Sequence, residues 1–266
     1  MEDITLRALY LLKNANIILS EDTRTCRKLL EKHGIFSSKL EIYNDHSSKD
    51  TRNKIKQLIS QGNIVALTSD AGTPLISDPG FKLVRDLQEE NFYIDVIPGA
   101  CAALAALVIS GISSDKFCFL GFLPKSQNKK DEELRNFDNL KTTLILYESP
   151  QRLEKTLKSI YDNLGNREVA IVKEITKLNQ KIYKDKVQEL LKNFSNINLK
   201  GEFVLVISPD SEKKDQISET EIQQKINKML DNNYSAKDIA EILLSEHSSQ
   251  ISKNYVYKYI NRTRDN

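Results

Sequence analysis

The chain has 266 residues, of which 39% are hydrophobic and 29% charged, and its formal net charge is +2. This composition is that of a globular protein and excludes collagen-like, glutamine-rich and acidic low-complexity chains. The longest apolar run, from Ala100 to Ile109, is too short to span a bilayer, and the first ten residues do not form a signal peptide. We therefore expect a cytoplasmic protein with no membrane contact.

The cysteines and histidines give no sign of a disulfide framework or a metal site. The three cysteines form no CxxC pair, and the three histidines lack the spacing of metal ligands. We expect no bound metal.

Short β-branched or aromatic runs alternate with amphipathic stretches along the first 210 residues. The predicted strands are Asn16–Leu19, Asn63–Thr68, Phe92–Ile97, Lys116–Leu123, Thr142–Tyr147, Glu168–Val172 and Glu202–Ile207. The predicted helices are Thr51–Ser60, Phe81–Glu89, Cys101–Ile109, Asp131–Asn136 and Leu153–Leu164. Strands separated by helices indicate an α/β fold with a largely parallel sheet.

Two breaks divide the chain. A helix of small residues gives way to a strand around Gly111–Lys116, and a polar, strand-free segment follows Pro209. Beyond it, Ser235 and Asp238 predict the start of a short helix, and a last helix carries Lys253, Tyr255, Tyr257, Lys258, Tyr259 and Arg262. The predicted parts are an α/β lobe (1–114), a second α/β lobe (115–210) and a helix-turn-helix-like helical domain behind a linker (211–266).

The loop from Thr68 to Gly80 is the most informative for function. It lies between a predicted strand and a helix, where ligands of open α/β sheets bind, and it holds Asp70, Thr73 and Asp78 between two glycines. It lacks both the GxxxxGK[ST] and the GxGxxG pattern, so we expect a polar ligand that is not rich in phosphate. The alternative is a tight connection with helix-capping aspartates.

Four more polar segments follow predicted strands in the same way. They are Ser20–Cys26, Ile97–Leu104, Tyr147–Arg152 and Lys173–Lys177. Recurrent polar strand ends predict a cleft between two α/β lobes, as in a small-molecule transferase or synthetase. The alternatives are helix packing through alanines at Ala100–Ala103 and surface salt bridges at the last two segments. Two local basic surfaces, at Arg152–Lys186 and in the last fourteen residues, are also predicted, with scattered solvated lysines as the alternative.

At these loops the sequence resembles the 16S rRNA (cytidine-2'-O)-methyltransferase family of the tetrapyrrole methylase superfamily. The matching segments are Glu2–Ala8, Ser20–Arg24, Ser69–Gly80, Ile97–Gly99, Phe117–Pro124, Tyr147–Arg152, Lys173–Lys177, Lys200–Glu202 and Tyr257–Tyr259. They run in order over nearly the whole chain. The patterns DAGTPxxSDPG and YESPxR separate this branch from the relatives of the cobalamin pathway.

The resemblance implies two lobes with S-adenosylmethionine between them, commonly in a homodimer, acting on the small ribosomal subunit. The implied cofactor residues are Asp70, Gly72, Thr73, Ile76, Ala100, Cys101, Ala102 and Tyr147. The residues implied to face the RNA are Glu21, Arg24, Arg152, Glu174 and Lys177, together with Asp22 and His46 as candidates for a general base. A positioned base contributes about 10²–10⁴-fold to such a transfer.

The beginning of the chain departs from the family pattern. Family members carry a strand and a Pro-Ile-Gly-Asn-Leu turn before the segment matched by Glu2–Thr5, and Met1 stands at the position of that leucine. We therefore expect the first strand to be missing from this sequence, through a start assigned too far downstream or, as the alternative, a truncated gene product.

Two other functions stay open from the sequence. One is a related methyltransferase acting on a tetrapyrrole or on a modified histidine of an elongation factor, although those relatives carry Gly-Asp-Pro where this chain has Gly72-Thr-Pro74. The other is a catalytically impaired homologue that retains RNA binding through its helical tail.

Overall fold

The structure is a computed structural model, and it describes residues 2–36, 39–138, 140–209, 219–232, 234–247 and 252–264. The chain divides into two compact units, Met1–Pro209 and Asp210–Asn266. The predicted linker after Pro209 and the turn after the second tail helix fall largely outside the described residues.

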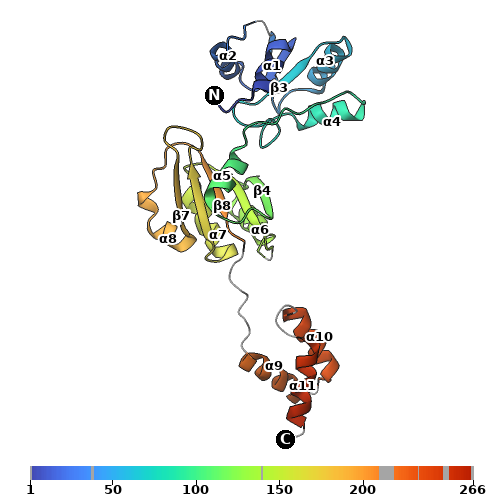
Figure 1. Ribbon diagram of the computed structural model, residues 1–266, viewed down its shortest axis with the longest axis vertical. Coiled ribbons are helices and arrows are strands. Elements are labelled where there is room, and N and C mark those ends of the chain that lie inside the picture. The colour runs from blue at the N-terminus through green and yellow to red at the C-terminus, as the bar shows by residue number, and fades with distance from the viewer. Residues whose placement is uncertain are drawn as a thin grey trace. The chain divides into compact units, whose positions relative to one another are not determined.

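The first lobe is built around a three-stranded parallel sheet of order β2-β1-β3. Figure 1 shows this lobe with its helices α1 to α4. Its elements are α1 (Leu6–Asn14), β1 (Ile17–Ser20), α2 (Thr23–Lys32), β2 (Lys39–Ile42), α3 (Lys49–Ser60), β3 (Val65–Thr68) and α4 (Phe81–Glu89). The central strand β1 is buried along its whole length. Side chains cap the helices: the hydroxyl of Thr5 accepts from the N–H of Ala8, and that of Ser48 accepts from the N–H of Thr51.

The second lobe holds a five-stranded sheet of order β4-β5-β8-β6-β7. Its elements are α5 (Ala102–Ser110), β4 (Phe117–Phe122), α6 (Gln127–Arg135), β5 (Thr143–Glu148), α7 (Leu153–Leu164), β6 (Glu168–Lys173), β7 (Lys181–Lys186), α8 (Val187–Lys192), the short 3-10 helix η1 (Phe194–Asn196) and β8 (Phe203–Ile207). One core cluster joins the sheet to α7, and a second joins the sheet to α5 through Ala103, Ala106 and Leu107.

The helix α5 thus packs on the second sheet, although the sequence assigned everything up to residue 114 to the first lobe. The residue at which the two lobes divide stays a prediction.

The prediction of a largely parallel sheet is correct for the first lobe and wrong for the second. There only β4 and β5 pair in parallel, because β8 returns antiparallel between β5 and β6, and β6 forms an antiparallel pair with β7. Continuous apolar strands indicate burial on both faces but carry no information on strand direction.

The segment Phe92–Ile97 is not a strand, contrary to the prediction. Its backbone forms no ladder in the structure, and the side chains of Tyr93 and Val96 are 89% and 68% exposed. A strand is defined by its hydrogen-bonded neighbour, so an apolar run without one remains irregular.

The tail unit has a core of its own. It consists of α9 (Glu219–Asp231), α10 (Ala236–His247) and α11 (Lys253–Arg264), which pack around Ile226, Ile239 and Ile260. The predicted helix start at Ser235 is confirmed, since its hydroxyl accepts from the N–H of Asp238. In the described parts of the chain no helix is both long and apolar enough to cross a membrane.

Candidate active site at the strand ends

The polar loops of the first lobe meet at the carboxyl edge of its parallel sheet. The backbone N–H of Asp22, just after β1, donates to the carboxylate of Asp70, just after β3, at 3.3 Å. Beneath them the Thr68 hydroxyl donates to the carbonyl of Leu19 at 3.1 Å. The strand order β2-β1-β3 is what brings these segments together although 48 residues separate Asp22 from Asp70 in the sequence.

The loop between β3 and α4 has an unusual backbone. Leu75 and Ser77 have positive φ angles of 71° and 66°, which residues with side chains seldom adopt. Among the described residues the other non-glycine positions of this kind are Glu174, Thr176 and Asn91, so four of the five lie in two of the predicted functional loops. Backbone strain gathers at functional sites, so it supports the selection of these two loops.

Two contacts join the predicted cofactor segments. The Thr73 hydroxyl donates to the carbonyl of Ala100 at 2.8 Å, which ties the β3–α4 loop to the segment before α5. The Tyr147 hydroxyl accepts from the N–H of Ala103 at 3.2 Å, which ties β5 to the first turn of α5. Edge-to-face contacts with Phe119 and Phe122 hold the Tyr147 ring. Burial raises the pKa of this tyrosine, and the neighbouring Cys101 adds to the effect.

The polar groups and the open space at these loops fit the cofactor that the family resemblance implies. S-adenosylmethionine carries a sulfonium, an ammonium and a carboxylate. The side chain of Cys101 does not cap α5, so the first-turn amides other than that of Ala103 can meet a carboxylate, and the exposed Asp70 can meet a cation. The small side chains of Ala100 and Ala102 leave space over the backbone, and Ile76 is exposed beside them on the β3–α4 loop. The assignment of the individual cofactor residues remains a prediction.

The residues after β1 form a charged turn. Asp22 caps α2 by accepting from the N–H of Arg24 at 2.8 Å, and the Arg24 guanidinium lies 2.7 Å from its carboxylate. The bond from Arg24 is the main reason that the pKa of Asp22 falls to about 2. A carboxylate with so low a pKa is a weak proton acceptor, so this geometry fits a capping role better than the predicted role of base. Glu21 lies exposed beside it.

The second predicted base, His46, is exposed on the connection between β2 and α3. Its backbone N–H donates to the Asn44 side chain at 3.0 Å, which shapes the turn. A part for its imidazole in catalysis stays a prediction.

Arg152 has partners inside the protein. Its guanidinium donates to the carbonyls of Leu123 and Pro124 at 2.7 and 3.1 Å and lies 3.3 Å from the fully buried carboxylate of Glu148. It thereby joins the start of α7 to the end of β4. Binding of an RNA phosphate by Arg152 remains a prediction, and it would have to compete with these contacts.

Glu174 and Lys177 are paired with each other at 3.0 Å, and Lys177 also lies 2.8 Å from Glu202. The pKa of Lys177 is raised, chiefly by its bond to Glu202, and the pKa of Glu174 is lowered, chiefly by Lys177. Other cations of the predicted basic surface at Arg152–Lys186 are paired too: Lys158 with Glu154, and Lys184 with Glu168. The structure therefore favours the salt-bridge alternative for the segments Tyr147–Arg152 and Lys173–Lys177.

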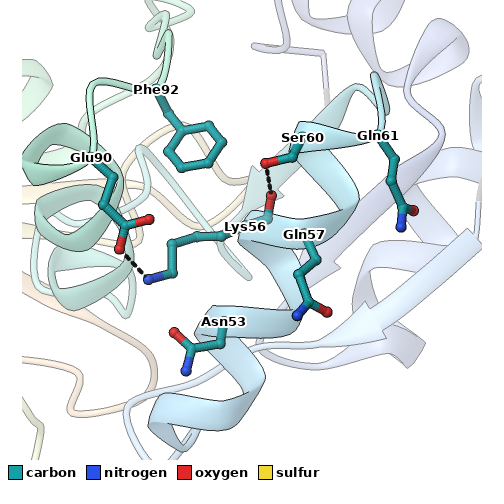
Figure 2. Close-up of a pocket in the computed structure, with 7 residues that line it drawn as sticks. All are labelled: Asn53, Lys56, Gln57, Ser60, Gln61, Glu90 and Phe92. Carbon is teal, nitrogen blue, oxygen red and sulfur yellow. Dashed lines mark hydrogen bonds and ion pairs between the residues drawn. The ribbon is translucent and has the colours of Figure 1, made fainter.

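One pocket of the first lobe lies away from these loops. A pocket of about 500 Å³ lies between α3 and α4, and Figure 2 shows the residues that line it: Asn53, Lys56, Gln57, Ser60, Gln61, Glu90 and Phe92. Its one cation, Lys56, is neutralised by Glu90 at 2.5 Å. The pocket borders the C-terminal end of α3, which leads into β3. It therefore lies near the amino edge of the sheet, opposite the polar loops. Because ligands of α/β sheets bind at the carboxyl edge, we do not assign this pocket to the cofactor.

The sequence analysis names Asp78 among the polar residues of the ligand loop but not among the cofactor or catalytic candidates. It is half-buried in the β3–α4 loop, and burial together with the carboxylates of Glu21, Asp70 and Asp45 raises its pKa. The sequence places it between two glycines but gives no signal of its burial. Among the described residues, no group of three or more Asp, Glu, His or Cys side chains is arranged to hold a metal ion.

The first lobe has a parallel sheet with the predicted functional loops at its carboxyl edge. It is tied to a second lobe with a mixed sheet, which contributes Tyr147. This arrangement is that of a two-lobed α/β transferase. Solved structures share this fold. A cobalt precorrin-4 methyltransferase aligns with a TM-score of 0.59 and 18% identity over 78% of this chain and 89% of its own. A uroporphyrin-III C-methyltransferase from Thermus thermophilus, complexed with S-adenosylhomocysteine, aligns with a TM-score of 0.54 and 16% identity over 78% and 91%. At such identities the likeness shows the fold alone.

The family follows from the sequence comparisons. Residues 1–191 match the model of the Tetrapyrrole (Corrin/Porphyrin) Methylases. A ribosomal RNA small subunit methyltransferase I from Rickettsia prowazekii is 43% identical over 263 residues, 99% of this chain and 93% of the relative. One from Thermotoga maritima is 39% identical over 78% of this chain and 93% of its own length. The chain belongs to the tetrapyrrole methylase family and, within it, to the ribosomal RNA small subunit methyltransferase I family.

Three predictions from the sequence are thereby confirmed: the family, the two-lobed α/β fold and the class of enzyme, a methyltransferase. The expected cofactor, S-adenosylmethionine, is in keeping with membership of this methyltransferase family.

Proposed function

We propose that this enzyme transfers a methyl group from S-adenosylmethionine to the ribose 2'-hydroxyl of a cytidine in 16S rRNA of the small ribosomal subunit. The observation that carries the proposal is the 43% identity to a ribosomal RNA small subunit methyltransferase I over 99% of the chain. The contacts that join the predicted cofactor loops, from Thr73 to Ala100 and from Ala103 to Tyr147, support it.

In this proposal the cofactor lies along the β3–α4 loop and the first turn of α5. Asp70, Gly72, Thr73 and Ile76 contact it from one side, and Ala100, Cys101, Ala102 and Tyr147 from the other. The sulfonium is a strong electrophile, so these residues contribute mainly by holding the acceptor oxygen, the methyl carbon and the sulfur in line. Glu21 and Arg24 lie at the same sheet edge, where the target ribose would enter.

The RNA is bound as a single strand or with the target nucleotide turned out of its helix, because the ribose must reach the loops. The tail adds affinity through α11, which carries the exposed Lys253, Lys258 and Arg262 and no acidic residue. The α11 tyrosines contribute less than their sequence suggests, since Tyr255 and Tyr259 are half-buried and their hydroxyls contact α9.

We also propose that the enzyme is a cytoplasmic homodimer. Its substrate would be found in the cytoplasm, and apolar side chains on α5 and β4 are available to a second copy. Leu104, Val108, Phe117 and Phe122 are 48%, 79%, 45% and 57% exposed. Light scattering on the purified chain should give twice the monomer mass, and a monomer at micromolar concentration would contradict this part of the proposal.

The function is tested by combining the purified chain, methyl-labelled S-adenosylmethionine and small ribosomal subunits that lack the modification. We expect label in 16S rRNA, on the ribose of one cytidine after nuclease digestion and mass spectrometry. Titration calorimetry with the cofactor alone is the companion measurement. RNA binding without cofactor binding would favour the catalytically impaired alternative. Cofactor binding with no label in any RNA would favour a tetrapyrrole or protein substrate.

A further inference from the structure

A row of aligned residues crosses the second sheet at the end of β5. Glu148 of β5 is aligned with Phe203 of β8, Phe203 with Lys173 of β6, and Lys173 with Lys181 of β7. Because β5 and β6 both run antiparallel to β8, they are parallel to each other and end at the same edge of the sheet. Lys173 therefore lies level with the residue that follows Tyr147, two strand spacings or about 10 Å away.

Lys173 and Lys181 lie on the same face of the sheet. Side chains alternate along a strand, and Val169 and Ile171 of β6 belong to the core cluster on the α7 side, so Lys173 is on that face too. Tyr183 of β7 packs against the same cluster, and the ammonium of Lys181 lies 4.8 Å from the centre of its ring. Directly opposite residues of an antiparallel pair have Cα atoms about 5 Å apart. Two cations are thus placed side by side.

This lysine pair, Lys173 and Lys181, is unfavourable in the protein alone. Like charges directly opposite each other on neighbouring strands are destabilising. Lys173 is also only 4% exposed, so little water reaches its side chain. A covered charge is normally paired with an opposite one. The pair therefore has the character of a site that is incomplete without an anion.

The carboxylates of the same edge are already bound to other cations. Glu148 lies 3.3 Å from Arg152, Glu174 lies 3.0 Å from Lys177, and Glu202 lies 2.8 Å from Lys177. In the part of the chain that the structure describes, none of these carboxylates forms a salt bridge with the lysine pair, and no other carboxylate does so. The protein thus provides the cations of this site without their counter-ion.

A third cation lies at the same edge. The connection before β8 reaches it, because β8 begins at Phe203, level with the end of β6. The N–H of Asn198 in this connection donates to the Tyr183 hydroxyl at 3.2 Å, which ties the connection to the strand of Lys181. Lys200 follows two residues later, is exposed, and forms no salt bridge with any residue that the structure describes.

We propose that Lys173, Lys181 and Lys200 form an oxyanion site that holds a backbone phosphate of the rRNA. A phosphate placed there replaces the repulsion between the lysines by attraction to each of them. The site lies on the face of the sheet opposite α5, so it leaves the proposed cofactor segments free. The identity of the anion rests on the proposed function, whereas the presence of an oxyanion site does not.

The first test measures binding of small ribosomal subunits between about 50 mM and about 200 mM salt. Lys181→Gln and Lys200→Gln change exposed side chains, and Lys173→Met keeps the apolar stem of the covered lysine while removing its charge. Each variant that loses a phosphate contact should lower the slope of log affinity against log salt by about 0.7. Affinity for S-adenosylmethionine should stay at the wild-type value in all three.

Lys158→Gln is the matched control. Lys158 is an exposed lysine of α7 that is already paired with Glu154 at 2.7 Å, so its loss should leave the slope unchanged. Wild-type slopes in Lys173→Met, Lys181→Gln and Lys200→Gln would overturn the assignment to RNA phosphate.

The second test needs neither RNA nor cofactor. An anion that binds only the folded protein raises its melting temperature. Inorganic phosphate should therefore stabilise the wild type more than chloride of the same ionic strength, and Lys158→Gln should respond like the wild type. The gain should be smaller in Lys173→Met and Lys181→Gln.

The two tests separate this site from the proposed function. A gain from phosphate that is the same in all variants would overturn the oxyanion site. A gain that depends on the lysines, together with unchanged RNA slopes, would show an oxyanion site that the RNA does not use and would overturn the assignment to rRNA. A wild type that labels no RNA contradicts the proposed function, and a gain that depends on the lysines would still support the oxyanion site.

Discussion

At the scale of single residues, the structure gives some of the predicted site residues different partners from those expected. The motif Tyr147–Arg152 identifies a functional segment, but the sequence cannot show that Glu148 becomes fully buried and accepts from the Thr156 hydroxyl at 2.6 Å. Nor can it show that Arg152 donates to two carbonyls 28 and 29 residues away. Residue type and loop position were predictable. The pairing of charges was not, because it depends on which connections the sheet brings together.

Arg152→Leu tests the internal role of this arginine. The substitution leaves Glu148 buried without its cation and two carbonyls without a donor, and breaking a pair of this kind costs about 3 kcal/mol. Urea unfolding should show this loss of stability. Lys155→Leu, on the exposed side of the same helix, should stay within about 0.5 kcal/mol of the wild type. Unchanged stability together with weaker RNA binding would instead assign Arg152 to an RNA phosphate.

At the scale of elements, the strands that the sequence predicted correctly are those made largely of apolar residues. β5 and β8 are buried along most or all of their length and read as apolar runs. The strands β2 and β7 were missed because they lie at sheet edges with largely exposed, charged side chains, as in the segment Lys181–Lys186. Exposed edge strands often carry charges, which discourage pairing with other chains and also obscure the strand pattern. Phe92–Ile97 shows the opposite error, an apolar run without a strand partner.

A largely covered ion pair joins α3 to α4. Arg52 Nε lies 2.6 Å from the Asp86 carboxylate, and both side chains are largely covered, at 12% and 14% exposed. The hydrogen bond from Arg52 is the main reason that the pKa of Asp86 is lowered. A carboxyl whose pKa falls on folding stabilises the fold above its unfolded pKa, and this contribution is lost as the pH falls through the folded pKa.

Asp86→Asn should therefore melt at a lower temperature than the wild type at pH 7. The difference should shrink steadily below about pH 4, where the wild-type carboxyl also becomes neutral. A gap that persists undiminished in acid would mean that Asp86 acts through shape and not through charge.

At the scale of the whole molecule, the candidate site is formed by segments far apart in the sequence. The sequence predicted the candidate loops, because each follows a predicted strand. It could not predict that Asp22 meets Asp70 or that Tyr147 meets Ala103, since these contacts depend on the strand orders β2-β1-β3 and β4-β5-β8-β6-β7. The independent tail core around Ile226 and Ile260 likewise became evident only from the packing.

The two-unit organisation predicts that methyl-donor binding and RNA binding can be separated. The chain 1–209 keeps both sheets and all three segments of the proposed cofactor site. Calorimetry should therefore give the same affinity for S-adenosylmethionine as the full chain. Binding of small subunits should be weaker, because the cations of α11 are lost.

Salt dependence shows whether charge is the cause. Each lost phosphate contact should lower the slope of log affinity against log salt by about 0.7 on single-stranded RNA. The full-length variant Lys258→Gln with Arg262→Gln keeps the tail core and removes two exposed cations of α11. It should therefore reproduce part of the drop in slope. If the slope is unchanged in both proteins, the tail does not contact RNA phosphate, and the RNA is held by the two lobes alone.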